Sequence, residues 1–102
     1  MIDLIVKQRS HIERLCREHR VRRLEVFGSA SDDRFDQTHS DIDLLVDFLP
    51  LKDGEHADAY FGLLEGLETL LGRPVDLVMA TAASNPYFIQ SITQSRTELY
   101  AA

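Results

Sequence analysis

A glycine–serine pair and three aspartates are the residues of this chain whose types and spacing could do chemistry: Gly28, Ser29, Asp41, Asp43 and Asp76. Asp41 and Asp43 stand two residues apart in a segment that alternates polar and apolar side chains. In a strand, both carboxylates leave the same face. Two carboxylates at such a short distance repel each other, and a divalent cation between them removes the repulsion. Mg²⁺ suits such oxygen ligands, because it binds one or two carboxylates and fills its shell with water and phosphate oxygens.

Asp76 could add a third carboxylate from an adjacent strand. It lies between Val75 and Leu77 in an apolar segment where strand propensity disfavours aspartate, and Asp43 is out of place in its own segment in the same way. Three converging carboxylates can hold two Mg²⁺ ions about 3.5–4 Å apart for in-line displacement at phosphorus. We therefore expect Asp41 and Asp43 to bind both ions. Asp76 would bind the ion on the side of the attacking hydroxyl and accept its proton.

The Gly28–Ser29 pair could bind the phosphates of a nucleotide. The segment before it reads as a strand that ends at Gly28. A glycine there lets the backbone approach a phosphate without a Cβ atom in the way. The amides that follow and the Ser29 hydroxyl would donate to phosphate oxygens. Taken alone, a Gly–Ser pair is a common turn and Asp41 an ordinary loop residue. The pair at a strand end, followed by Asp-x-Asp at the start of the next strand, is far more specific.

The hydrophobic pattern predicts the elements that must position these residues. Helical spacing predicts a helix over 4–19 and another over 57–71, and alternation predicts strands over 22–28, 41–48 and 75–79. The expected buried stripe of the second helix consists of Tyr60, Phe61, Leu64, Leu67 and Leu71.

The last predicted element is a helix that begins at Asn85–Pro86, an N-cap followed by proline at the first helical position. Helical spacing continues it towards the C-terminus through Ile89, Ile92, Arg96 and Leu99. The predicted order is helix, strand, strand, helix, strand, helix, which is an α/β fold around a small sheet.

Length and charge limit the function classes. A chain of 102 residues is enough for a single domain, 1–102, and leaves no room for a separate acceptor-binding domain. The formal net charge of -6 disfavours direct nucleic-acid binding, although a nucleotide bound with Mg²⁺ remains compatible with it. One cysteine, Cys16, cannot form an internal disulfide, which fits the cytoplasm. No apolar run approaches the length of a membrane span.

The chain resembles the minimal nucleotidyltransferases of the polymerase-β-like superfamily in its segment VFGSASDDRFDQTHSDIDLLVDF. More narrowly, it is similar to the MntA-type antitoxins that pair with HEPN-domain toxins of the HepT type. The superfamily signature falls on Gly28, Ser29, Asp41 and Asp43, with eleven residues between Ser29 and Asp41, and its third carboxylate falls on Asp76. The resemblance extends over almost the whole chain. It implies the nucleotidyltransferase fold, a small mixed sheet flanked by helices.

The function that the resemblance implies is Mg²⁺-dependent transfer of AMP from ATP. In antitoxins of this kind the acceptor is a tyrosine hydroxyl of the cognate toxin, and the modification inactivates a ribonuclease. A HEPN-domain partner in a hetero-oligomer agrees with a chain that has no acceptor domain of its own. The resemblance assigns Gly28 and Ser29 to nucleotide binding and Asp41, Asp43 and Asp76 to catalysis and metal binding.

Two other functions stay open from the sequence. Where relatives commonly carry an arginine or threonine and then a glycine, Ala30 is followed by Ser31, Asp32 and Asp33. Two acids beside a triphosphate would repel it, and a non-catalytic antitoxin that masks its toxin by binding would not need the nucleotide. The third hypothesis is transfer to a hydroxyl of a small molecule, with a partner subunit supplying the pocket.

Overall fold

A computed structural model describes residues 3–27, 42–80 and 97–102 of the chain. Seven elements follow one another in these ranges: α1 (Asp3–Lys7), α2 (Arg9–Glu18), β1 (Val21–Phe27), β2 (Ile42–Phe48), α3 (Glu55–Leu71), β3 (Val75–Met79) and β4 (Thr97–Ala101). The three predicted strands and both predicted helices within these ranges are confirmed, except that the first helix is divided at Gln8. None of the described helices is long and apolar enough to cross a membrane.

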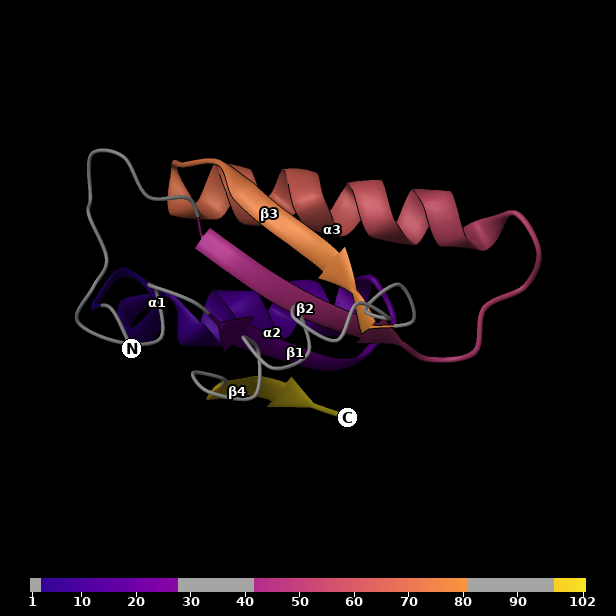
Figure 1. The fold of residues 1–102 in the computed structure, drawn as a ribbon, viewed down its shortest axis with the longest axis horizontal. Helices are drawn as coiled ribbons and strands as arrows, with labels where there is room; N and C mark the ends of the chain where they lie inside the picture. The colour runs from indigo at the N-terminus through magenta and orange to yellow at the C-terminus, as the bar shows by residue number, and fades with distance from the viewer. Residues whose placement is uncertain (1–2, 28–41, 81–96) are drawn as a thin grey trace, which may run out of the picture.

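The four strands form one mixed sheet in the order β3-β2-β1-β4 (Figure 1). β1 runs antiparallel to both β2 and β4, whereas β2 and β3 run parallel. Parallel neighbours need a crossover connection, and α3 supplies it. Figure 1 shows α3 lying along β3 at one side of the sheet and β4 at the other. The fold class is therefore the expected α/β arrangement, with a sheet of both strand orientations.

All three helices pack on one face of the sheet and form the main core there. The strands contribute the alternate residues that the sequence pattern assigns to this face, such as Leu24 and Val26 of β1 and Leu44 and Val46 of β2. The helices contribute Ile5, Ile12, Cys16, Leu63, Leu67 and Leu71, all buried. A smaller apolar cluster lies on the opposite face and consists of Phe27, Leu45, Val78 and Ala80. The period of two in the strands thus separates a helix-covered face from a second face, on which Asp43 and Asp76 lie.

Two glycines of α3 allow α2 to approach closely. A Cβ atom at Gly62 would lie 2.8 Å from Cε1 of His19, and one at Gly66 would lie 2.8 Å from Cδ2 of Leu15. The two glycines are four residues apart and so lie on the same side of the helix. His19 and Leu15 therefore pack directly against the α3 backbone, which fixes α3 against the start of β1.

The prediction of a helix through Leu99 is wrong for the last residues. Thr97–Ala101 form β4, which pairs antiparallel with β1. Leu99 is buried in the main core, as its apolar character suggests, but it reaches the core from a strand. A single apolar residue in this segment fits a helix or a strand equally well, and pairing with β1 decides the outcome. The predicted helix start at Asn85–Pro86 lies outside the described residues.

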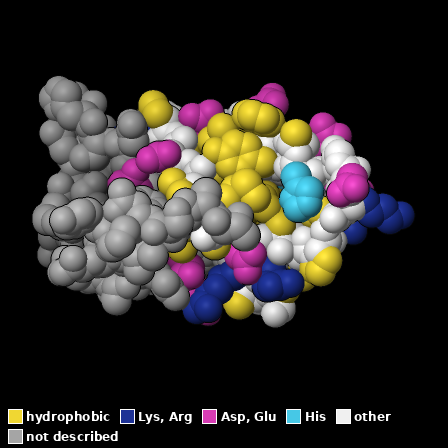
Figure 2. All heavy atoms as spheres, turned by 45° about the vertical axis from the view of Figure 1, so that its right-hand side comes forward, with side chains coloured by type: hydrophobic (Ala, Val, Ile, Leu, Met, Phe, Trp, Pro, Cys, Tyr) yellow, Lys and Arg dark blue, Asp and Glu magenta, His cyan; other side chains and the backbone are white. Residues whose placement is uncertain are grey.

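The predicted buried stripe of α3 is also partly wrong. Leu67 and Leu71 are buried as expected, but Leu63 completes the stripe, and Phe61 is 62% exposed. The Phe61 ring instead makes an edge-to-face contact with Tyr60, with ring centroids 5.1 Å apart. Figure 2 shows apolar side chains gathered near the middle of one face of the molecule, with acidic side chains around them.

Candidate active site

Asp43 and Asp76 are register partners in the parallel pair of β2 and β3. Register partners point to the same face of a sheet, and adjacent strands lie about 4.8 Å apart. The flanking residues Leu44 and Leu77 are also partners and point into the main core, so the two carboxylates leave the other face. Asp43 is half-buried and Asp76 is exposed. The sequence expectation that these two aspartates share a face of adjacent strands is confirmed.

The end of β1 completes this row across the sheet. Phe27, the last residue of β1, is the antiparallel partner of Asp43 and is buried. In the sequence, Gly28 follows Phe27 directly and Asp41 precedes Ile42 directly. Gly28, Ser29 and Asp41 lie outside the described residues, so their expected roles remain predictions. Of the five predicted site residues, the structure therefore brings together Asp43 and Asp76.

Two side chains of α3 hold the backbone on either side of Asp76. The Val75 N–H donates to Oε2 of Glu68 over 3.1 Å, and the Tyr60 hydroxyl donates to the Leu77 carbonyl over 2.5 Å. Towards β2, the Ile42 N–H donates to the carbonyl of Pro74 over 3.3 Å. The strand that carries Asp76 is thus tied to β2 on one side and to α3 on the other.

Tyr60 and Glu68 are not among the site residues that the sequence predicts. The apolar pattern assigns Tyr60 to the core of its helix, and nothing in the pattern distinguishes Glu68. Their relation to Asp76 depends on how α3 crosses back over β3, and no local pattern encodes that crossing. The weak signal in the sequence is the short distance from Glu68 through Gly72 and Pro74 to Val75.

Carboxylate oxygens such as those of Asp43 and Asp76 suit a hard cation such as Mg²⁺. Within the described ranges, no three or more histidine, cysteine, aspartate or glutamate side chains come together as a metal site. Two neighbouring carboxylates are the usual protein contribution to a Mg²⁺ ion that shares its shell with substrate phosphates. The Asp43–Asp76 pair fits that role.

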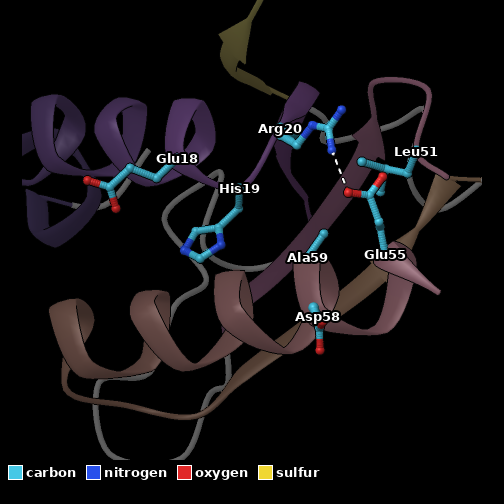
Figure 3. A pocket seen from close by; sticks show the side chains of 7 residues that line it. All are labelled: Glu18, His19, Arg20, Leu51, Glu55, Asp58 and Ala59. Atoms are coloured by element: carbon cyan, nitrogen blue, oxygen red, sulfur yellow. Dashed lines mark hydrogen bonds and ion pairs between the residues drawn. The ribbon is translucent and has the colours of Figure 1, made fainter.

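A separate cavity of about 210 Å³ lies at the other end of the sheet (Figure 3). Its lining includes His19, Arg20, Leu51 and Glu55. Figure 3 shows Arg20 and Glu55 pointing toward each other, and their ion pair spans 3.0 Å. Leu49, which follows β2, donates its N–H to the carbonyl of Arg20. About 20 Å of strand therefore separates this cavity from Asp43 at the start of β2, so it is distinct from the aspartate pair.

Known proteins share both sequence and fold with this chain. The profile of the nucleotidyltransferase domain family matches residues 8–99. Two proteins of Methanocaldococcus jannaschii are 39% and 36% identical to this chain over 87 residues, which is 84% of this chain and 84% of each relative. Both are named as candidate protein adenylyltransferases.

Among solved structures, a candidate minimal nucleotidyltransferase is 30% identical, with a TM-score of 0.73 over 94% of this chain and 95% of that one. A tri-AMPylated HEPN toxin of Shewanella oneidensis in complex with an MNT antitoxin contains a chain of the same fold, with 22% identity and a TM-score of 0.65 over 95% of this chain and 72% of that one. A toxin–antitoxin complex with AMP-PNP matches with 24% identity and a TM-score of 0.69, over 92% of this chain and 73% of that one. By the family profile and by its sequence relatives, this chain belongs to the nucleotidyltransferase domain family.

Proposed function

We propose that this nucleotidyltransferase transfers AMP from ATP to a tyrosine hydroxyl of a HEPN-domain toxin and thereby inactivates it in the cytoplasm. The register of Asp43 with Asp76 is the observation that carries the proposal, because it puts two carboxylates side by side on the face of the sheet opposite the helices. Nucleotidyl transfer needs little covalent chemistry from the protein. It needs oxygen ligands that position a phosphate-bound cation and the acceptor hydroxyl.

The relatives support the choice of donor and acceptor. The two M. jannaschii proteins are named for adenylyl transfer to protein. The Shewanella structure holds an AMPylated HEPN toxin with its MNT antitoxin, and another toxin–antitoxin complex holds AMP-PNP, a nucleotide analogue. The same donor and the same class of acceptor are therefore the simplest assignment for this chain.

In the proposed reaction, the acceptor oxygen attacks the α-phosphorus of ATP. The bond from that phosphorus to the bridging oxygen breaks, so that the products are an AMP ester of tyrosine and pyrophosphate. Bound Mg²⁺ would supply charge stabilisation for the triphosphate and lower the pKa of the hydroxyl. Asp41, Asp43 and Asp76 would hold the metal, with Asp76 on the side of the acceptor, where it would also take up the hydroxyl proton. Gly28 and Ser29 would donate hydrogen bonds to the phosphates.

The acceptor would come from a partner chain, as the similar Shewanella structure of an AMPylated HEPN toxin in complex with an MNT antitoxin suggests. The apolar surface in Figure 2 and the exposed ring of Phe61 fit a protein-binding function. Contiguous apolar surface on a small domain commonly marks a protein interaction site.

The test is to mix the purified chain with a HEPN-domain partner encoded beside it, ATP and Mg²⁺, and to measure the intact mass and the ribonuclease activity of the partner. The proposal predicts that the partner gains AMP and loses ribonuclease activity, and that chelation of Mg²⁺ prevents both. Ribonuclease inhibition without a mass increase would instead show masking by binding. A mass increase only on a small-molecule acceptor would show the third function.

A further inference from the structure

The two hydrogen bonds from α3 side chains reach the backbone of the residues directly before and after Asp76. In a strand, successive residues direct their backbone groups to opposite edges. The Pro74 carbonyl faces β2, because it accepts the Ile42 N–H. Val75 and Leu77 direct backbone groups the other way, where Glu68 accepts the Val75 N–H and Tyr60 donates to the Leu77 carbonyl. The residue between these two contacts is Asp76.

We propose that Tyr60 and Glu68 are positioning residues that hold the Asp76 carboxylate in register with Asp43 for metal binding. This inference rests on the proposed function, since it concerns the same pair of carboxylates. Neither side chain touches the reacting groups in this account. Both act through the backbone of β3.

β3 depends on this support more than β2 does. β2 lies between β1 and β3, whereas β3 is the last strand in the described sheet and has five residues. A slip of β3 by one residue would move Asp76 to the helix-covered face, because side chains alternate. A much smaller displacement would also matter, since a shift of about 1 Å in a reacting group can cost a hundredfold in rate. The hydrogen bonds from Glu68 and Tyr60 to β3 oppose both the register slip and the smaller displacement.

The chemistry of the two contacts suits a fixed position. Glu68 is an anionic acceptor, and hydrogen bonds to charged groups are shorter and stronger than those between neutral groups. The Tyr60 ring packs against the main core, so its hydroxyl is presented from a fixed ring. Glu68 holds the backbone N–H of the residue before Asp76, and Tyr60 holds the backbone carbonyl of the residue after it. Sliding or rotation of the strand would therefore break at least one of these hydrogen bonds.

The competing explanation is that the two contacts only protect a sheet edge from pairing with another chain. Both explanations predict some loss of stability when the contacts are removed. Only positioning predicts a change in metal binding by protein that is still folded.

The experiment measures Mn²⁺ binding to the folded chain by electron paramagnetic resonance, using Mn²⁺ as the probe for Mg²⁺. Tyr60→Phe deletes only the hydroxyl, and Glu68→Met keeps the length of the side chain without its carboxylate. Glu68→Gln retains an acceptor oxygen and is the conservative rescue. Glu65→Met is the matched control, because Glu65 is an exposed acid of the same helix.

We expect Tyr60→Phe and Glu68→Met to weaken Mn²⁺ binding by about tenfold, in the range typical of residues that support metal ligands. By the same reasoning, the Mn²⁺ affinity of Glu68→Gln should stay within about threefold of the wild-type value. The Mn²⁺ affinity of Glu65→Met should equal that of the wild type. The concentration of Mg²⁺ needed for half-maximal AMP transfer should rise in parallel. Wild-type affinity in both Tyr60→Phe and Glu68→Met would overturn the inference, and so would a wild-type chain that binds no Mn²⁺.

Failure of the proposed function gives a different result. If the wild type binds Mn²⁺ and the variants weaken that binding, but no AMP reaches a HEPN-domain partner, then the positioning stands and the acceptor is wrong. If AMP transfer occurs and the variants keep wild-type metal dependence, then the proposed function stands and the positioning is wrong.

Discussion

Asp43 and Asp76 stand opposite each other in a parallel strand pair, one at the second residue of each strand as the structure describes it. This relationship joins residues 33 positions apart in the chain, and α3 alone connects their strands. Two acids at equivalent positions on adjacent strands would be unfavourable in a purely structural sheet, because like charges directly opposite each other are destabilising. In the proposed function, a bound cation would offset this repulsion.

The buried face of α3 includes Leu67 but not Phe61, so truncating these two side chains should affect stability unequally. Leu67 is fully buried, and Leu67→Ala should lower the free energy of unfolding by about 2–5 kcal/mol. Phe61 is 62% exposed, and Phe61→Ala should change it by less than about 0.5 kcal/mol. Urea unfolding of both variants measures the difference. Equal losses would show that the phenylalanine lies in the core, as the sequence pattern alone suggests.

The end of α3 predicts a purely conformational effect at Gly72. This residue has φ +67°, and a Cβ atom there would meet nothing within 4 Å. Gly72→Ala should therefore destabilise the chain by about 1–2 kcal/mol through the left-handed backbone alone. Gly72→Asn should cost less, because asparagine tolerates this conformation better. Thermal unfolding of the two variants is the measurement, and an alanine variant as stable as the wild type would contradict the assignment of the cap.

Cys16 should be chemically inert in the folded chain. Burial, with a smaller contribution from the nearby Glu13, raises the pKa of its thiol to about 12. The thiolate is the reactive form, so at about pH 8 the native protein should react with iodoacetamide only as fast as it unfolds. Alkylation followed by mass spectrometry, with and without denaturant, measures this. Rapid labelling of the native chain would contradict the burial of Cys16.

The same pKa shift predicts a loss of stability at alkaline pH. The unfolded thiol releases its proton near pH 9, whereas the folded thiol keeps it until about pH 12. The unfolded state therefore binds fewer protons between these values, and the stability contribution, complete below pH 9, falls as the pH rises towards 12. Cys16→Ala should remove this component. The measurement is the difference in unfolding free energy between wild type and variant across that pH range, and a constant difference would contradict the prediction.

Much of the fold is predictable from local patterns. The strand with Asp43 has apolar residues at every second position, and the helix before Gly72 has a clear end, so the predicted bounds of both lie close to the observed ones. The last strand is not predictable in this way, because Leu99 alone does not distinguish a strand from a helix and its pairing with β1 is non-local. The same limit applies to Phe61, since both it and Leu63 fit an apolar helix face.

The site is predictable to the extent that unusual residues reveal it. Asp43 and Asp76 interrupt apolar strands, and that misfit in the sequence is sufficient to suggest that they form a pair. Tyr60 and Glu68 make hydrogen bonds that depend on the packing of α3 on β3. Aromatic and acidic residues are ordinary in an amphipathic helix, so nothing in their spacing distinguishes them.

The most direct test of the account is the rate of AMP transfer to the HEPN-domain partner by three matched variants. Asp43→Asn and Asp76→Asn should each lower the rate by about a thousandfold with the fold retained, because several kcal/mol of charge stabilisation are lost at about 1.4 kcal/mol per tenfold. Asp47→Asn is the control, since Asp47 lies on the same face of β2 but pairs with Arg22 at 3.5 Å, and it should retain the wild-type rate. Transfer at the wild-type rate by either Asp43→Asn or Asp76→Asn would contradict the account.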